Sequence, residues 1–109
     1  MPYYMVQAAY TPESWAAQIK AQPDPRVRIG ALAEAVGGRL DSLFYCFGEY
    51  DIVGIAEFPS NEAAAAFSIT ASAGGAGKAI KTTPLMTVEE GLSFMKKASD
   101  ASPAYRPPT

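Results

Sequence analysis

The most informative absence from this 109-residue chain is histidine, of which the sequence has none. Histidine is the side chain that most readily exchanges a proton near neutral pH, and it is the commonest metal ligand. Its absence excludes the usual cysteine–histidine catalytic pair. We therefore expect neither a metal centre nor a cofactor.

Cysteine is almost as scarce, since Cys46 is the single one. One cysteine cannot form an internal disulfide. Cys46 lies in an apolar strand-like run, where a free thiol usually behaves as a small buried hydrophobic side chain. A nucleophilic thiol would need a nearby base or cation to lower its pKa, and the buried interpretation is favoured.

Basic charge and long apolar runs are also lacking. The chain has 9 Lys and Arg against 11 Asp and Glu, a net charge of -2, and Lys96-Lys97 is the one adjacent basic pair. Nucleic-acid binding depends on clustered basic residues, so we expect no nucleic-acid partner. No run reaches the roughly 18 apolar residues that cross a bilayer, and the start resembles no signal peptide, so we expect a cytoplasmic protein without a membrane partner.

Helix caps and apolar periodicity divide the chain into segments. Thr11-Pro12 and Asp24-Pro25 have the form of helix starts, and Thr87 with Glu90 fits a capping box. The pattern predicts strands over 3–10, 40–47, 50–58 and 76–86, and helices over about 12–22, 25–36, 60–73 and 87–98. It divides the protein into one domain over 1–98 and a flexible, proline-rich tail over 99–109.

The order of these segments predicts an α+β fold. It is the ferredoxin-like βαββαβ arrangement, a four-stranded antiparallel sheet with both crossover helices on one face, followed by an extra C-terminal helix. Gly48-Glu49 lies between the two central strands at hairpin spacing, which predicts a tight two-residue turn.

The alternation of side chains along the strands assigns the two sheet faces. Tyr4, Val6 and Ala8 share a face with Gly54 and Ala56, and these small residues suit close approach of the helices. The other face is mixed and would expose a large apolar patch in a monomer, which usually marks an interface. Its apolar members are Met5, Val53 and Ile55, and we expect two sheets to pair across them as a homodimer or higher homo-oligomer.

The run Phe47-Gly48-Glu49-Tyr50-Asp51 is followed by the strand 52–57 and by Pro59-Ser60-Asn61-Glu62. Lys78–Thr82 then precedes the capping box. Through these segments, nearly the whole chain resembles the GYD family of small bacterial proteins. The resemblance implies a dimeric α+β barrel, in which two ferredoxin-like sheets enclose a shared core. The family has no established activity, so the resemblance implies a fold and an assembly but no reaction.

The candidate chemical groups fall on predicted strands. Tyr50, Asp51 and Glu57 are the candidate catalytic residues, since a desolvated carboxylate can act as a base without histidine unless Lys81 pairs with it. We expect convergence of polar groups on the sheet face away from the helices. The candidate ligand-binding residues are Gln7, Tyr45, Tyr50, Asp51, Glu57 and Lys81.

A structural interpretation of the same groups is the alternative. Asp51 beside a glycine often stabilises a turn, and a tyrosine such as Tyr50 often packs. A pair of Glu57 with Lys81 would serve only to hold subunits together. The glycine-rich segment 74–77 allows close approach of a ligand or a partner backbone, or it is simply a flexible helix exit.

Three classes of function agree with these patterns. The first is a homo-oligomeric protein that binds a small, partly apolar or aromatic molecule in a cavity between sheet and helices. The second is a cofactor-independent enzyme of the isomerase, cyclase or monooxygenase type, which other dimeric α+β barrels resemble. The third is a structural or regulatory interaction module. A perturbed carboxylate in a cavity would favour the enzyme, and an apolar cavity without one would favour the binding protein.

Overall fold

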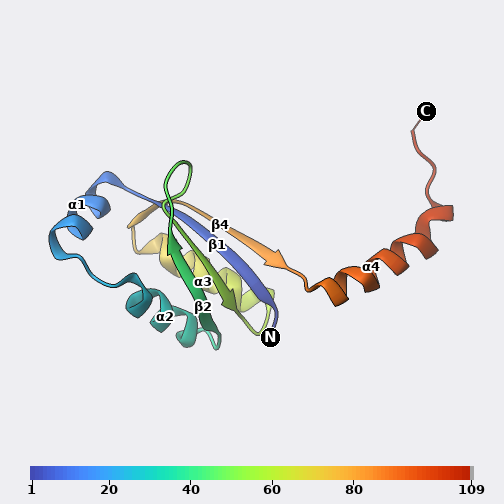
Figure 1. The fold of residues 1–109 in the computed structure, drawn as a ribbon, viewed down its shortest axis with the longest axis horizontal. Coiled ribbons are helices and arrows are strands. Elements are labelled where there is room, and N and C mark those ends of the chain that lie inside the picture. The colour runs from blue at the N-terminus through green and yellow to red at the C-terminus, as the bar shows by residue number, and fades with distance from the viewer. Residues whose placement is uncertain (109) are drawn as a thin grey trace.

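The protein folds as one antiparallel sheet with two helices packed against a single face (Figure 1). The computed structural model describes residues 1–108. The strands lie side by side in the order β2-β3-β1-β4, which is the predicted ferredoxin-like topology. In chain order the elements are β1 (Tyr3–Tyr10), α1 (Pro12–Ala21), α2 (Pro25–Ala35), β2 (Arg39–Tyr45), β3 (Ile52–Glu57), α3 (Asn61–Ala73), β4 (Gly77–Leu85), α4 (Val88–Ala101) and a 3₁₀ turn (Ser102–Ala104).

The helices begin where their caps predict. The Thr11 hydroxyl accepts a hydrogen bond from the amide of Ser14 at 3.1 Å, and proline follows it as the first helical residue. Asp24 caps α2. Thr87 and Glu90 bond each other's backbone amides at 3.1 and 2.9 Å, which completes the predicted capping box.

The core lies between the sheet and helices α2 and α3. Tyr4 and Ala56 point toward the helices, as the alternation predicts. The Phe58 ring contacts those of Tyr4 and Phe67 in tilted geometry, at centroid distances of 5.5 and 5.2 Å. Such aromatic contacts add to the free energy gained by burying the rings. Ala33 of α2 and Ala64 of α3 complete the buried cluster.

The predicted tight turn between β2 and β3 is wrong. Residues 46–51 form a longer loop, and the backbone bond from Cys46 N to Asp51 O at 2.8 Å closes its base. Phe47 at the tip is 98% exposed. Gly48 has a φ of 122°, a conformation that glycine adopts without strain.

Helix α4 extends away from the domain (Figure 1). It buries no residue, and the radius of gyration is 17.6 Å, against about 13 Å expected for a compact domain of this size. The helix is amphipathic. Its apolar residues are Val88, Leu92, Phe94 and Met95, which we call the α4 stripe, and all four are exposed.

The last helix runs further than the sequence predicts, to Ala101 instead of about Ala98. The 3₁₀ turn then occupies part of the segment that was expected to be a tail. Within residues 1–108, none of the helices combines the length and the apolar character that crossing a bilayer requires.

Candidate functional site

A cavity of about 330 Å³ lies between the sheet and helices α2 and α3. Its floor is made by the helix-facing residues of β1 and β3, including Val6 and Ala8. Ile29 and Leu32 of α2 form one wall, and Phe67 of α3 lies on the other side. The volume is within the range typical of small-molecule sites, which are concave and mostly apolar.

The space exists because small residues stand where larger ones would fill the core. Ala8 and Ala71 leave room above the sheet. Gly54 lets the side chains of β2 lean across β3, since a Cβ there would meet Leu43 Cδ1 at 3.0 Å. Leu40 and Leu43 thereby close one side of the cavity.

The cavity has a deep apolar end and an open polar end. Ala33, Ala56 and Phe67 are buried at the deep end. The exposed lining residues mark the mouth, where the start of α2 meets the end of α3; they are Arg28, Thr70, Gly74 and Ala76. The glycine-rich segment 74–77 thus forms part of this rim.

Arg28 and Tyr10 are the polar groups at the mouth. The Arg28 guanidinium donates a hydrogen bond to the Tyr10 hydroxyl at 2.7 Å, and its central carbon lies 5.7 Å from the centre of the ring. The second distance suits a cation–π contact. Burial raises the pKa of the Tyr10 phenol, and the Arg28 charge opposes this shift. The phenol therefore stays protonated at neutral pH.

Asp51 lies beside this end of the cavity and accepts two hydrogen bonds there. One of its carboxylate oxygens accepts the amide of Tyr10 at 2.8 Å and the indole N–H of Trp15 at 3.3 Å. The Trp15 ring also meets the Tyr10 ring edge-on at 5.2 Å. Asp51 thus joins the β2–β3 loop to the end of β1 and to α1.

Tyr50 and Cys46 belong to the same loop. Both are half-buried, and the Cys46 thiol donates to the Tyr50 carbonyl at 3.3 Å. The sequence predicts a buried Cys46 within a strand, but the residue is only half-buried and lies just beyond the end of β2. Neither residue lines the cavity.

Three other predicted site residues, Gln7, Glu57 and Lys81, lie on the opposite face of the sheet, which we call the open face. Gln7 of β1 is opposite Lys81 of β4, but Glu57 is opposite Tyr3, four residues further along. Glu57 instead forms an ion pair with Arg39. The chain therefore brings Gln7 and Lys81 together and leaves Glu57 apart from them.

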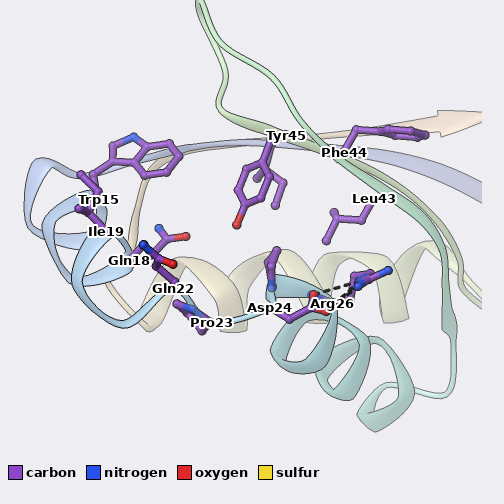
Figure 2. Close-up of a pocket in the computed structure, with 12 residues that line it drawn as sticks. Trp15, Gln18, Ile19, Gln22, Pro23, Asp24, Arg26, Leu43, Phe44 and Tyr45 are labelled. Atoms are coloured by element: carbon purple, nitrogen blue, oxygen red, sulfur yellow. Dashed lines mark hydrogen bonds and ion pairs between the residues drawn. The ribbon is translucent and has the colours of Figure 1, made fainter.

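Tyr45 faces the helix side of the sheet and lines a separate groove of about 540 Å³ (Figure 2). Figure 2 shows its hydroxyl end directed into the space between β2, α1 and the linker to α2. Trp15 and Ile19 lie across the groove on α1, and an exposed Asp24–Arg26 ion pair borders it. Tyr45 thus shares no surface with Gln7 and Lys81.

The predicted site residues therefore fall into three separate places, and sequence reasoning missed Arg28 and Tyr10. In the sequence, Arg28 lies between the apolar helix residues Val27 and Ile29, so its charge resembled an ordinary solvent-facing position. A signal was present in the unusual number of small residues on the helix-facing side of the strands. Among residues 1–108, no three acidic or thiol side chains gather closely enough to hold a metal ion.

Fold and site together define a ferredoxin-like α+β protein with an apolar cavity between its sheet and its helices. The family model of the GYD domain matches residues 4–95, which is nearly the whole chain. The protein therefore belongs to the GYD domain family.

Two solved structures match most of the chain at low sequence identity. A hypothetical protein from Pyrococcus horikoshii is 10% identical, with a TM-score of 0.47 over 80% of this chain and 92% of that one. A protein from Agrobacterium tumefaciens is 17% identical, with a TM-score of 0.48 over 79% of this chain and 92% of that one. No curated protein sequence matches the chain.

Proposed function

We propose that this protein binds a small, largely apolar molecule in the cavity between its sheet and helices α2 and α3. The observation that carries the proposal is the lining, which is aliphatic or aromatic at the deep end and polar only at the mouth. Apolar molecules gain free energy when they leave water for such a space. At about 30 Å³ for each water-sized atom group, the volume of about 330 Å³ suits a ligand of about 11 non-hydrogen atoms.

The groove in Figure 2 is larger but less suited to this role. Its walls include Ile19 and Tyr45, which are 70% and 56% exposed, so a ligand there would stay largely in water. The cavity, in contrast, is lined in part by the buried residues Tyr10, Ala56 and Phe67. Small-molecule sites usually enclose most of the ligand surface, and this favours the cavity.

Binding is favoured over catalysis by the positions of the acidic groups. None of the candidate bases lines the cavity: Asp51 bonds a backbone amide and an indole, and Glu57 pairs with Arg39 on the open face. A cofactor-independent enzyme would need a proton acceptor within hydrogen-bond reach of its substrate.

We further propose that the protein works as a homodimer or higher homo-oligomer. Two apolar surfaces lack a partner within the described chain, the open face with Met5, Val53 and Ile55, and the α4 stripe. A second copy presents the same surfaces, so a two-fold arrangement can cover both without another protein. Pairing of open faces would also give the barrel that the sequence resemblance implies.

The cavity proposal is tested by filling the cavity. Ala71→Leu places a larger side chain in the lining on α3, while Ala66→Leu makes the same change at an exposed position of that helix outside the lining. Calorimetric titration with cinnamamide, a neutral molecule of the expected size, should show binding to the wild type and to the control variant. Ala71→Leu should weaken it about tenfold or more, because the ligand and the leucine compete for one space.

Two results would contradict the proposal. One is a wild-type protein that does not bind cinnamamide at millimolar concentrations and that carries no small molecule in native mass spectrometry. The other is equal binding by wild type and Ala71→Leu, which would place the ligand elsewhere. Melting curves of both variants establish that each is folded.

A further inference from the structure

Within residues 1–108, Arg28 has no acidic partner, whereas Arg26 and Arg39 each form an ion pair. Among residues 1–108 the ion pairs of arginine are those of Arg26 with Asp24 and of Arg39 with Asp41 and Glu57. Arg28 donates one hydrogen bond, to the Tyr10 hydroxyl. A guanidinium has five N–H donors in a planar fork, so most of its donors are free.

The position of this charge matters more than its lack of a partner. Arg28 is part of the lining at the mouth of the cavity, while the deep end is closed by Ala33, Ala56 and Phe67. A molecule that enters with its apolar part first would leave its other end beside Arg28. The site therefore offers an apolar chamber and one cationic group at a fixed end.

We propose that the ligand of this cavity is an amphipathic carboxylic acid, whose carboxylate binds Arg28 while its apolar body fills the space toward Phe67. This inference rests on the proposed function of the cavity. A planar carboxylate matches the guanidinium fork with two parallel hydrogen bonds. The volume of about 330 Å³ leaves room for an apolar body of about nine atoms besides the two carboxylate oxygens.

Tyr10 acts as a positioning residue for this contact. Its hydroxyl oxygen accepts the bond from Arg28, which leaves the hydroxyl proton free to be donated to the same carboxylate. Because the phenol is neutral, it adds no negative charge that would repel the ligand. The ring, held against Trp15, limits the directions in which the Arg28 side chain can point.

Other charges near the mouth do not outweigh the attraction of Arg28 for a carboxylate. The end of α3 contributes the partial negative charge of a helix C-terminus, about half a unit, but the amides of Gly74 and Gly75 already bond carbonyls of its last turn. The start of α2, from which Arg28 projects, contributes a partial positive charge of similar size. The carboxylate of Asp51 is bonded to the Tyr10 amide and the Trp15 indole. The full charge of Arg28 therefore dominates.

The test compares two ligands of one shape that differ in charge. Cinnamate and cinnamamide have the same number of non-hydrogen atoms, and only cinnamate carries a carboxylate. Calorimetric titration of the wild type at low salt should show that cinnamate binds about tenfold more tightly or better, as a charge-assisted pair of hydrogen bonds would give. Arg28→Gln should abolish the preference, because it removes both the positive charge and the planar fork.

Control variants separate contact from general electrostatics. Arg26 lies two residues before Arg28 and is already paired with Asp24. Arg26→Gln removes the same charge as Arg28→Gln and should keep the preference for cinnamate. Tyr10→Phe should reduce the preference severalfold by releasing the guanidinium. Arg28→Lys, which keeps the charge but not the fork, should lie between wild type and Arg28→Gln.

Each outcome has a distinct meaning. If neither ligand binds the wild type, the cavity proposal itself fails. If both bind with equal affinity, or if Arg28→Gln keeps the preference for cinnamate, the cavity stands and the assignment of a carboxylate to Arg28 is overturned. Equal loss of preference in Arg26→Gln and Arg28→Gln would also overturn it, because a long-range field would then explain the preference.

Discussion

Replacing Asp51 with alanine should destabilise the protein severely. The carboxylate joins three elements, because one oxygen accepts the Tyr10 amide at 2.8 Å and the Trp15 indole at 3.3 Å from within the β2–β3 loop. Hydrogen bonds to a charged group contribute about 1.5–3 kcal/mol each, and the longer bond to Trp15 belongs at the low end. Asp51→Ala should therefore lower the free energy of unfolding by about 3 kcal/mol.

The size of this effect separates the structural role from a chemical one. In Asp51→Asn the amide oxygen can accept both bonds without the charge, so the loss should fall to about 1 kcal/mol. Urea denaturation at one protein concentration, followed by the fluorescence of the single tryptophan Trp15 and by circular dichroism, measures both variants. For a domain of this size, Asp51→Ala should also melt more than about 10 °C below the wild type.

Glu49→Ala is the matched control, since Glu49 is an exposed acid of the same loop. It should change the stability by less than about 0.5 kcal/mol. An Asp51→Ala protein as stable as this control would refute the anchoring role. If that stable variant also lost affinity for cinnamamide, Asp51 would be a functional residue after all.

Two further predictions concern Tyr10 and the open face. Burial raises the folded pKa of the Tyr10 phenol above the unfolded value of about 10. Above about pH 10, unfolded chains therefore lose a proton that folded chains keep. The free energy of unfolding should be unaffected by this group below about pH 10 and should fall above it. Tyr10→Phe should flatten this alkaline fall in urea titrations, whereas Tyr105→Phe, at an exposed position, should not. Val53→Asp should shift the protein toward monomer in size-exclusion chromatography with light scattering, because an unpaired charge in an interface is costly. Ile69→Asp on exposed α3 surface should not, and an unchanged oligomer in Val53→Asp would show that the open faces do not pair.

The fold was predictable because its signals are local. Thr11, Asp24 and Thr87 each cap a helix through bonds to residues within three positions, and such bonds depend on short sequence patterns alone. Alternation along β1 and β3 is unbroken over the central residues, so their helix-facing sides were predicted correctly from Tyr4 and Ala56.

The tight hairpin and the convergence of the polar residues were predicted wrongly, because contacts between residues distant in sequence intervene. Asp51 turns its carboxylate to the end of β1, so regular pairing stops at Tyr45 opposite Ile52 and the tight turn does not form. The register of β2 shifts between Leu40 and Ser42, which reverses the alternation beyond that point. Tyr45 consequently faces the helices, away from Gln7.

Arg28 shows a different kind of failure. Its contact with Tyr10 joins residues 18 positions apart, across the linker between α1 and α2. Helical spacing identifies the apolar neighbours of Arg28 but not what lies opposite its side chain. Only the packing of α2 on the sheet places this charge at the mouth of a cavity.

The cavity itself has an energetic cost that bears on why it is present. An empty cavity of about 330 Å³ would cost about 8 kcal/mol at about 24 cal/mol for each Å³, which is comparable with the whole stability of a small domain. Water entering at the mouth reduces this cost, but water gains few hydrogen bonds from walls such as Ile29, Leu32 and Phe67. A larger residue at Ala71 should therefore stabilise the free protein while it blocks the ligand. If Ala71→Leu melts higher than the wild type and does not bind cinnamamide, the small residues are retained for binding at the expense of stability.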